Sequence, residues 1–296
     1  MKTAAAPLGA ALVALYTLMI SGADGITKLI SQGYAAPQLF ALSAAMVLAL
    51  TWTASRTTRA GAGGLRTRAP RVMALRSGLT VLACIGFFKA FHSLPFADVF
   101  LFIALMPVIA AILSGPTLGE PLRREAVAAL GLGTLGLFCL MPDGLSAAQP
   151  GHAWALMAAV TGTGSMLCAR HIGRIETNAL AQVFYPNLAI LVVMGLALPF
   201  VWRPMSLTDF GWVACYALFL FGARWVVTIA LRLLPAYVAT ALMNLQFVWM
   251  VLIGFVAFGE VPNIGSLTGV ALVIASGLWL VMAEHMPRET SAAAQA

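Results

Sequence analysis

A few basic residues lie inside long apolar segments of the sequence, where an unpaired charge is costly. Arg224 is the deepest of them, because about two helical turns of apolar chain separate it from Arg232. An arginine stays protonated, so its guanidinium must face water, a carboxylate or a ligand. The planar fork of donors suits an anionic group. We therefore predict that Arg224 binds the anionic group of a ligand, with pairing to a carboxylate of the protein as the structural alternative.

Asp24 and Lys28 lie four residues apart in the first apolar segment, on one face of the helix expected there. One interpretation is that the pair lines a cavity, where it binds a zwitterion or exchanges a proton. The alternative is a structural ion pair near the outer border of the membrane, with the Lys28 side chain reaching toward water. The sequence leaves both interpretations open.

Lys89 and His92 lie three residues apart in the third apolar segment, with Asp98 just past the Pro95 turn. Lys89 could hold a carboxylate of a substrate, and an imidazole can change its charge near neutral pH. His92 is therefore a candidate for coupling transport to protons. The alternative is that both side chains only reach water at the outer surface, because Pro95 marks the end of the helix.

Uncharged polar and aromatic side chains gather in two further apolar segments, where they can supply hydrogen bonds and an aromatic wall. Pro186 and Pro107 free backbone carbonyls within their segments, and the membrane tolerates this only where protein or a wet cavity satisfies the carbonyls. For the aromatic rings alone, packing against lipid is the alternative. The candidate substrate contacts of this kind are Tyr185, Asn187, Asn244, Gln246 and Trp249.

The composition indicates that membrane-spanning helices hold these residues. Of the 296 residues, 61% are hydrophobic and only 9% are charged, so lipid must solvate the surface. The sequence contains no phosphate-binding loop and no cysteine pairing at metal-ligand or redox spacing, so we expect secondary or facilitated transport, no cofactor, no metal and inert cysteines. The predicted spans, of about 20 residues each, are centred near Leu15, Met46, Ala83, Met106, Thr134, Val160, Ile190, Leu218, Trp249 and Ile274.

The distribution of basic residues predicts the orientation of the chain. If the amino terminus lies inside, thirteen of the seventeen basic residues fall on the cytoplasmic side, which places both termini in the cytoplasm. The net charge of +7 is then a topology signal, and no nucleic-acid binding is expected. The run from Arg56 to Arg76 is interpreted as a flexible cytoplasmic loop, with anionic-lipid contact as an alternative. The thirteen residues are Lys2, Arg56, Arg59, Arg66, Arg68, Arg71, Arg76, Arg123, Arg124, Arg170, Arg174, Arg232 and Arg288.

The chain contains an internal repeat. Residues 87–141 match residues 227–281 at a constant offset of 140, and a weaker match at an offset of 144 joins Gln38 to Gln182. Five helices per copy is an odd number, so the second copy enters the membrane from the opposite side. We predict an all-α membrane protein of ten transmembrane helices in two inverted five-helix repeats, residues 1–142 and 151–284, followed by a short cytoplasmic tail, residues 285–296.

Each repeat carries a leucine-proline turn, then an apolar span, then Gly-Glu and a glycine-rich closing span. The order of motifs resembles the ten-helix EamA-type carriers of the drug/metabolite transporter superfamily. The first copy also has a proline within its span, whereas Phe247 stands where the second half of the family often has one. The motifs are Leu94-Pro95, Met106-Pro107-Val108 and Gly119-Glu120 in the first copy, and Leu234-Pro235 and Gly259-Glu260 in the second.

The resemblance implies a pseudosymmetric bundle with a central cavity that moves small metabolites across a bacterial inner membrane, often outward. Glu120 and Glu260 each begin the closing helix of a repeat, where the helix dipole stabilises a carboxylate. We interpret both as caps or gate anchors on opposite membrane faces, and Pro107 and Pro186 as gating or structural residues.

We predict a secondary transporter that works by alternating access and exports small zwitterionic or carboxylated metabolites. Amino acids fit, as do amino-acid-derived compounds such as opine-type metallophores, and protons are a possible coupling ion. The alternatives are an uptake carrier for a vitamin or nucleotide-like compound, a passive channel, or an intramembrane enzyme. An enzyme is disfavoured because the sequence shows no paired metal-ligand histidines, no serine-lysine dyad and no aspartate cluster.

Overall fold

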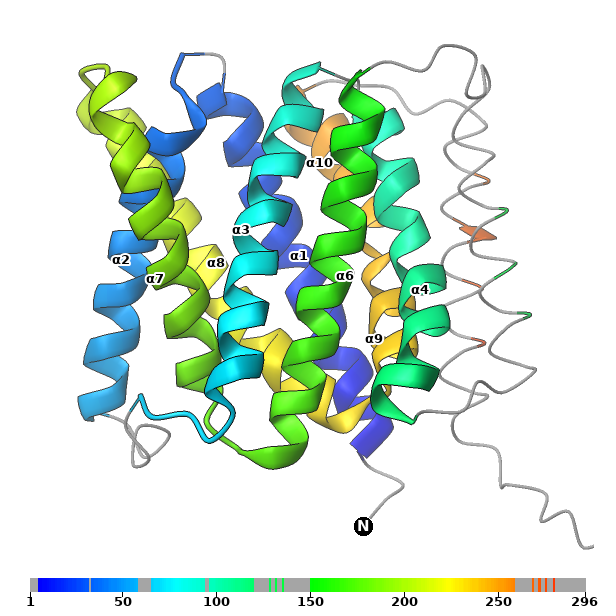
Figure 1. Cartoon of the computed structure of the whole chain (residues 1–296). Helices are drawn as coiled ribbons and strands as arrows, with labels where there is room; N and C mark the ends of the chain where they lie inside the picture. Colours follow the sequence, from blue (N-terminus) through cyan, green and yellow to red (C-terminus); the bar gives the residue numbers. More distant parts are fainter. Residues whose placement is uncertain are drawn as a thin grey trace, which may run out of the picture.

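The computed structural model describes residues 5–31, 33–57, 65–93, 96–119 and 150–258, with a few single positions in the segments between and after them. Within these residues the chain is helical and has no strand (Figure 1). The helices are α1 (Ala5–Ser31), α2 (Ala36–Thr57), α3 (Pro70–Ser93), α4 (Phe96–Leu118), α6 (Pro150–Ile175), α7 (Ala179–Ala197), the short η2 (Leu198–Phe200), α8 (Leu207–Leu233), α9 (Ala236–Met243) and α10 (Gln246–Phe258).

Eight of the ten predicted span centres fall within described helices. The predicted centres from Leu15 to Met106 fall in α1 to α4, and those from Val160 to Trp249 fall in α6, α7, α8 and α10. The spans predicted around Thr134 and Ile274 lie outside the described residues.

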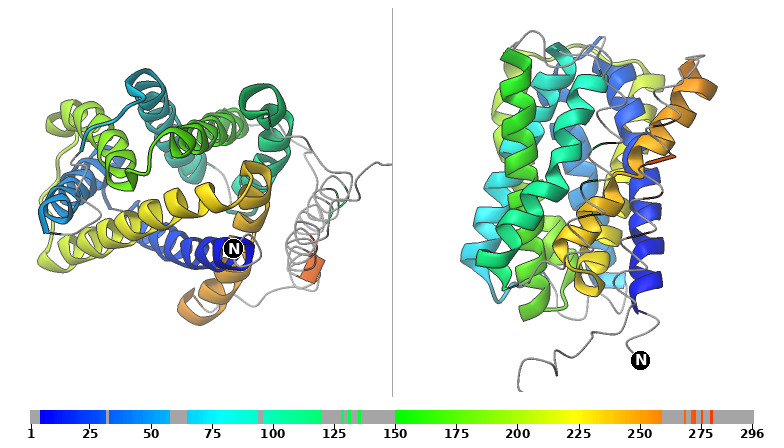
Figure 2. Two further views of the ribbon diagram at one scale, coloured as in Figure 1. Left: turned by 90° about the horizontal axis from the view of Figure 1, so that it is seen from below. Right: turned by 90° about the vertical axis from the view of Figure 1, so that its right-hand side faces the viewer.

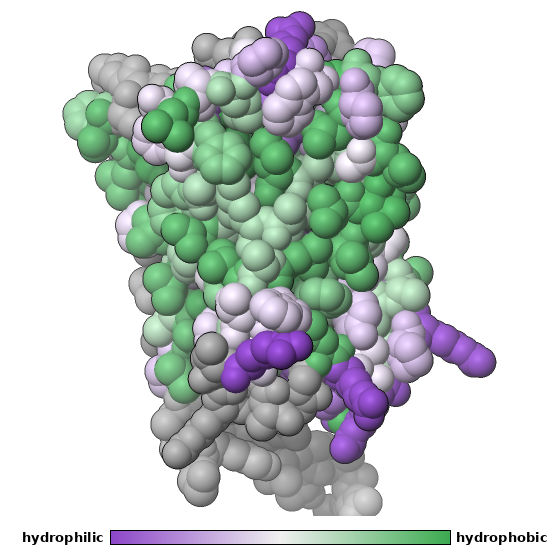
Figure 3. Space-filling model, turned by 90° about the vertical axis from the view of Figure 1, so that its left-hand side faces the viewer, coloured by the Kyte–Doolittle hydropathy of each residue, from purple (hydrophilic) through white to green (hydrophobic). Residues whose placement is uncertain are grey.

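Five of the described helices are long and apolar enough to cross a membrane. The face over α2 and α7 is hydrophobic across its middle and hydrophilic at its two ends (Figure 3). This distribution suits a helix bundle that is surrounded by lipid. The apolar segments are Pro7–Thr27, Ala36–Arg56, Pro70–Ala90, Ala179–Phe200 and Leu207–Leu233.

The helices pack in a pattern that joins the two halves of the sequence (Figures 1 and 2). Seen from below (Figure 2, left), α1 runs beside α8 and α10, and α6 runs beside α3 and α4. The α2 helix packs on α7, α3 on α7, α2 on α8, and α4 on α9. Exchanging α1, α2, α3 and α4 with α6, α7, α8 and the α9–α10 pair converts each of these contacts into another of them or, for α2 on α7 and α4 on α9, into itself.

Small and branched apolar side chains fill the contacts between the halves. Val13 of α1 packs with Ala223 and Leu231 of α8, and Leu39 of α2 packs with Val183 of α7. All five are buried. Alanine and valine let helix backbones approach closely, which is how helices gain packing energy in a solvent as apolar as lipid.

Gly86 marks the closest approach of α3 and α6. A Cβ at this position would lie 2.9 Å from the backbone oxygen of Trp154 and 2.9 Å from the Cβ of Ala158. Gly86→Ala should therefore destabilise the bundle by about 1–3 kcal/mol, because a helix backbone must move to accept the methyl group. A lowered midpoint of thermal unfolding in detergent would show this.

Gly78 provides the matched control on the same helix. A Cβ at Gly78 meets no atom within 4 Å, so Gly78→Ala should leave the midpoint unchanged or raise it. Equal midpoints for the two variants would contradict the close contact between α3 and α6.

The interpretation of residues 56–76 as a flexible loop is wrong for residues 70–76, which are helical. The α3 helix begins at Pro70, so Arg71 and Arg76 lie on a helix. Arg76 is buried and donates a hydrogen bond from Nη1 to Oε1 of Gln182 on α7. A proline suits the first helical position, because its missing N–H has no partner there in any helix. Charge density alone suggested a loop, whereas Arg76 is held by a neighbouring helix.

The apolar segment centred near Trp249 is not one continuous helix. It consists of α9 and α10, which are separated by a turn at Asn244 and Leu245. Short-range bonds from the N–H of Phe247 to the carbonyl of Asn244 and from Val248 to Leu245, both 3.0 Å, tighten the chain there. The break needs no proline, although Phe247 replaces the proline that the sequence pattern often has at this place. Discontinuous helices occur within membranes where protein or a wet cavity satisfies the freed backbone.

Candidate functional site

One face of α1 carries polar side chains into the centre of the bundle. Thr17, Ser21 and Asp24 are spaced by four and three residues, so they lie on one face of the helix. This face meets α8, α9 and α10. Thr17 and Ser21 are fully buried, whereas Asp24 stays partly exposed. A carboxyl group inside a membrane helix bundle needs polar partners or water.

The start of α10 is bound to this face of α1. Gln246 donates a hydrogen bond of 2.6 Å from Nε2 to Oδ2 of Asp24, and the Ser21 hydroxyl donates to the Gln246 carbonyl at 3.3 Å. Trp249 donates from Nε1 to the Thr17 hydroxyl at 3.0 Å. The break in the helix therefore places an amide, a backbone carbonyl and an indole against α1. Two of the predicted contacts, Gln246 and Trp249, meet Asp24 and its neighbours here.

A second polar group surrounds Arg224 on α8. Arg224 donates from Nη1 to Oδ1 of Asn187 on α7 at 2.7 Å, and Asn187 donates from Nδ2 to the Val183 carbonyl at 2.7 Å. Asn187 follows Pro186, which lies inside α7. In the described part of the chain, the partner of Arg224 is thus an uncharged amide. Arg224 as a whole residue is partly exposed, and this bond uses one of the five N–H donors of its guanidinium.

Electrostatic contacts connect the two groups. Tyr16 on α1 and Tyr216 on α8 each lie close enough to both Asp24 and Arg224 to interact with them electrostatically. Cys84 on α3 lies within the range of electrostatic interaction with Arg224. The carboxyl group of Asp24 and the guanidinium of Arg224 thus lie in one region of the bundle, and each is bound to a side-chain amide. We call Asp24, Gln246, Arg224 and Asn187 the central polar group.

The structure places the other predicted residues away from this group or leaves them undescribed. Tyr185 packs at the α3–α6–α7 contact against Met73 and Ile172, and its ring meets that of Phe184 edge to face. Asn244 is buried at the helix break. Lys89 and His92 are exposed near the end of α3. The side chains of Lys28 and Pro107, and residues Glu120 and Glu260, lie outside the described part of the chain.

Sequence reasoning missed several members of the site. Thr17 and Ser21 were not singled out because single hydroxyls are common in membrane helices. Their spacing with Asp24 on one face was the available signal. Tyr16 and Tyr216 gave no such signal, because aromatic residues in apolar segments are usually packed. The described residues contain no group of three or more histidine, cysteine or acidic side chains that could hold a metal ion.

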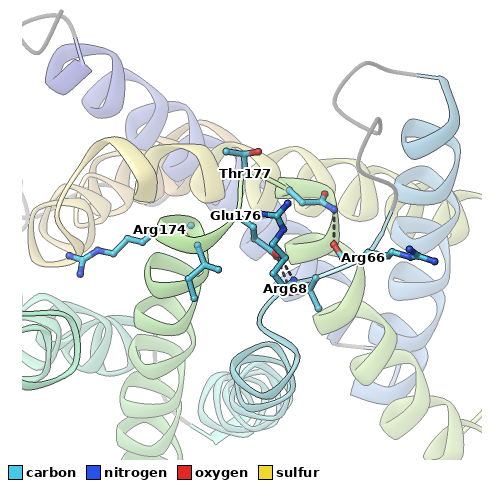
Figure 4. Close-up of a pocket in the computed structure, with 9 residues that line it drawn as sticks. Arg66, Arg68, Arg174, Glu176 and Thr177 are labelled. Carbon is cyan, nitrogen blue, oxygen red and sulfur yellow. Dashed lines mark hydrogen bonds between the residues drawn. The ribbon is translucent and has the colours of Figure 1, made fainter.

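A pocket of ≈ 570 Å³ opens at the end of the bundle where α2, α3, α6 and α7 are connected (Figure 4). Glu176 lies at its centre and is mostly buried. Arg66, Arg68 and Arg174 are exposed at its rim, and in the close-up they point in different directions. Arg174 donates to the Leu118 carbonyl at 2.5 Å, which occupies one end of its guanidinium. The pocket thus lacks a convergent cationic site.

Comparisons with known proteins agree with this geometry. A profile of the EamA-like transporter family matches residues 149–282. We call this matched stretch, which is similar to that family, the EamA-like domain. The family consists of membrane transporters, so the EamA-like domain indicates a multi-pass membrane transporter that acts on a small molecule.

The fold is also found in a solved structure, titled only as the crystal structure of a protein. That structure covers 98% of this chain and 100% of its own chain, with a TM-score of 0.78 and 19% sequence identity. At this identity the likeness shows the fold alone. No curated protein matches the chain.

The variant His92→Gln tests whether transport is coupled to protons through His92 on α3. If protons are coupled through His92, the pH dependence of transport should become flat in this variant, because glutamine cannot take up a proton. Initial rates in proteoliposomes across pH 5 to 8, roughly the range in which histidine changes its charge, would show this. An unchanged pH profile would remove His92 from the mechanism.

Proposed function

We propose that this protein is a secondary transporter of small zwitterionic or carboxylated metabolites, with its substrate site at the central polar group. The observation that carries the proposal is the placement of Asp24 and Arg224 in one region, both partly exposed inside the bundle. A guanidinium suits the carboxylate of a substrate, and a carboxylate suits its ammonium group. Amino acids and amino-acid-derived compounds, opine-type metallophores among them, carry both groups.

Neutral amides hold the two charged side chains. Asn187 binds Arg224 and Gln246 binds Asp24 through single hydrogen bonds of 2.7 Å and 2.6 Å. A substrate that binds the remaining donors and acceptors would keep these bonds. Trp249 and Tyr216 supply aromatic surface beside the charges. The charged groups are therefore oriented before the substrate enters, which lowers the cost of binding.

The packing pattern supports two inverted repeats that move by alternating access. Within the described residues, the contacts between helices keep the same pattern when α1 to α4 are exchanged with α6 to α10. We infer that residues 1–142 form a repeat equivalent to the EamA-like domain, and that the two enclose the central polar group. Basic residues at the end of the bundle that carries the N-terminus support a cytoplasmic location for that end in a bacterial inner membrane. Outward transport is part of the proposal.

Comparative metabolite profiling of a deletion strain and its complemented parent tests the function. A zwitterionic or carboxylated compound that accumulates inside the deletion strain and disappears from its medium would support export and identify the substrate. A compound that is missing from the cytoplasm while its external supply is left unused would instead show uptake. Flux proportional to the gradient, without saturation or counterflow, would indicate a channel and contradict the proposal.

A further inference from the structure

Hydrogen bonds join the two halves at the upper end of the bundle in Figure 1. Gln38 of α2 donates from Nε2 to the Arg203 carbonyl at 2.6 Å, and the Arg203 N–H donates to Oε1 of Gln38 at 3.0 Å. The hydroxyl of Tyr34 donates to Oδ2 of Asp209 at 2.7 Å. Gln38 is fully buried, so its side chain is shielded from water. We call this set, Tyr34 and Gln38 with Arg203 and Asp209, the upper clasp.

A second set of bonds joins the halves at the lower end (Figure 4). Glu176, which follows α6, accepts from the Thr67 hydroxyl at 2.9 Å and from the Arg68 N–H at 2.6 Å. Asn178 donates from Nδ2 to the Arg66 carbonyl at 3.0 Å. These bonds tie the segment before α3 to the turn between α6 and α7. We call this set, Arg66, Thr67 and Arg68 with Glu176 and Asn178, the lower clasp.

The two clasps lie at opposite ends of the same helix pair. Between them, α2 packs directly on α7 through Leu39, Val47, Val183 and Ile190, all buried. The repeat relates the clasps as well. At the offset of 144, Tyr34 of the upper clasp corresponds to Asn178 of the lower clasp. The contact between α2 and α7 is thus secured at both of its ends.

Both clasps are closed in one structure, which distinguishes them from a pair of gates. In alternating access, contacts that close a gate at one end must open when the other end closes. We propose that the α2–α7 side, with its two clasps, is a fixed seam about which the halves move during transport. The opening movement then takes place on the other side, among α3, α4, α9 and α10. This inference rests on the proposed function, because it assigns the hinge of that transport cycle.

Reversible cross-links across the two clasps test the seam. The pairs Arg66→Cys with Thr177→Cys, and Ala35→Cys with Trp202→Cys, each join two residues of different halves that line the same end pocket, and they leave the hydrogen-bonding side chains of both clasps in place. A cleavable thiol-specific cross-linker at both pairs should lower transport by less than about twofold. A loss of more than about tenfold that is reversed by reduction would overturn the seam. Single-cysteine variants control for the four native cysteines, Cys84, Cys139, Cys168 and Cys215.

Distances between spin labels provide a readout that does not depend on transport. Labels at the same two pairs should each give one narrow distance distribution in liposomes, with and without a mixture of the standard amino acids. A control pair on the other side, Ser93→Cys with Val256→Cys, should give more than one distance, because both positions are exposed and belong to different halves.

The spin labels separate failure of the seam from failure of the proposed function. Two populations at either clasp pair would overturn the seam even if transport is confirmed. A single distance at every pair would mean that the halves do not move, and it would reject the hinge. Absence of transport in the variants without cross-linker, with the label distances as expected, would reject the proposed substrates and retain the seam.

Discussion

Replacing Arg224 by alanine is expected to lower transport by about 100-fold or more while the protein still folds and inserts. The guanidinium is bound to Asn187 and keeps further donors available in the partly exposed interior. Losing a charge-assisted contact to a desolvated carboxylate costs about 1.5–3 kcal/mol for each hydrogen bond, and a fork makes two. Initial rates in proteoliposomes, with the substrate identified by metabolite profiling, would measure the loss.

Two further variants make the Arg224 result specific. Arg224→Lys keeps the charge but loses the planar fork, so it should recover only a small part of the rate. Arg71→Ala removes an exposed arginine at the start of α3 and should leave the rate unchanged. Wild-type transport by Arg224→Ala would remove Arg224 from the substrate site and leave its bond to Asn187 a structural contact.

Replacing Asp24 by asparagine is expected to abolish discrimination in favour of substrates that carry an ammonium group. Asparagine has an oxygen that can accept the bond from Gln246, so the contact between α1 and α10 should persist while the charge is lost. Transport of a zwitterion should fall by about tenfold or more. Transport of the matching carboxylate without the amino group should stay the same or rise. Competition between the two compounds in proteoliposomes would measure this.

Asp24→Glu is the matched control, because it keeps the charge and moves it by one methylene group. It should retain most of the preference for the zwitterion. If Asp24→Asn and the wild-type protein prefer the same compound, Asp24 does not contact the substrate, and its bond to Gln246 only joins two helices.

The sequence predicted helical spans well, because the membrane imposes one rule on every segment. The spans around Ala83 and Ile190 follow from about 20 predominantly apolar residues. Which residues begin a helix depends on local contacts, and here the sequence was less informative. Arg76 was assigned to a loop from charge density, whereas its bond to Gln182 holds it inside the bundle.

The central polar group was predicted in part. Arg224 and Asp24 stand out because a charge in an apolar segment is costly. Asn187 and Gln246 stand out because an amide in such a segment is costly as well. Their pairing could not be predicted, because it depends on where α10 begins. The turn at Asn244 and Leu245 directs Gln246 and Trp249 toward α1. The turn contains no proline or glycine from which it could have been predicted. Lys89 and His92 also lie in an apolar segment of the sequence, but they are exposed near the end of α3.

The packing of α1 sets the order in which the protein can be assembled. This helix lies more than 200 residues before α10 in the chain, yet its polar side chains bind α10, across separations of 222 residues for Asp24 and 232 for Thr17. The intervening chain must leave the ribosome before Asp24 meets Gln246. Until then α1 must remain beside the insertion machinery or in a wet site, because a carboxylate is costly in lipid. The docking of α10 on α1 is therefore a late step of biogenesis.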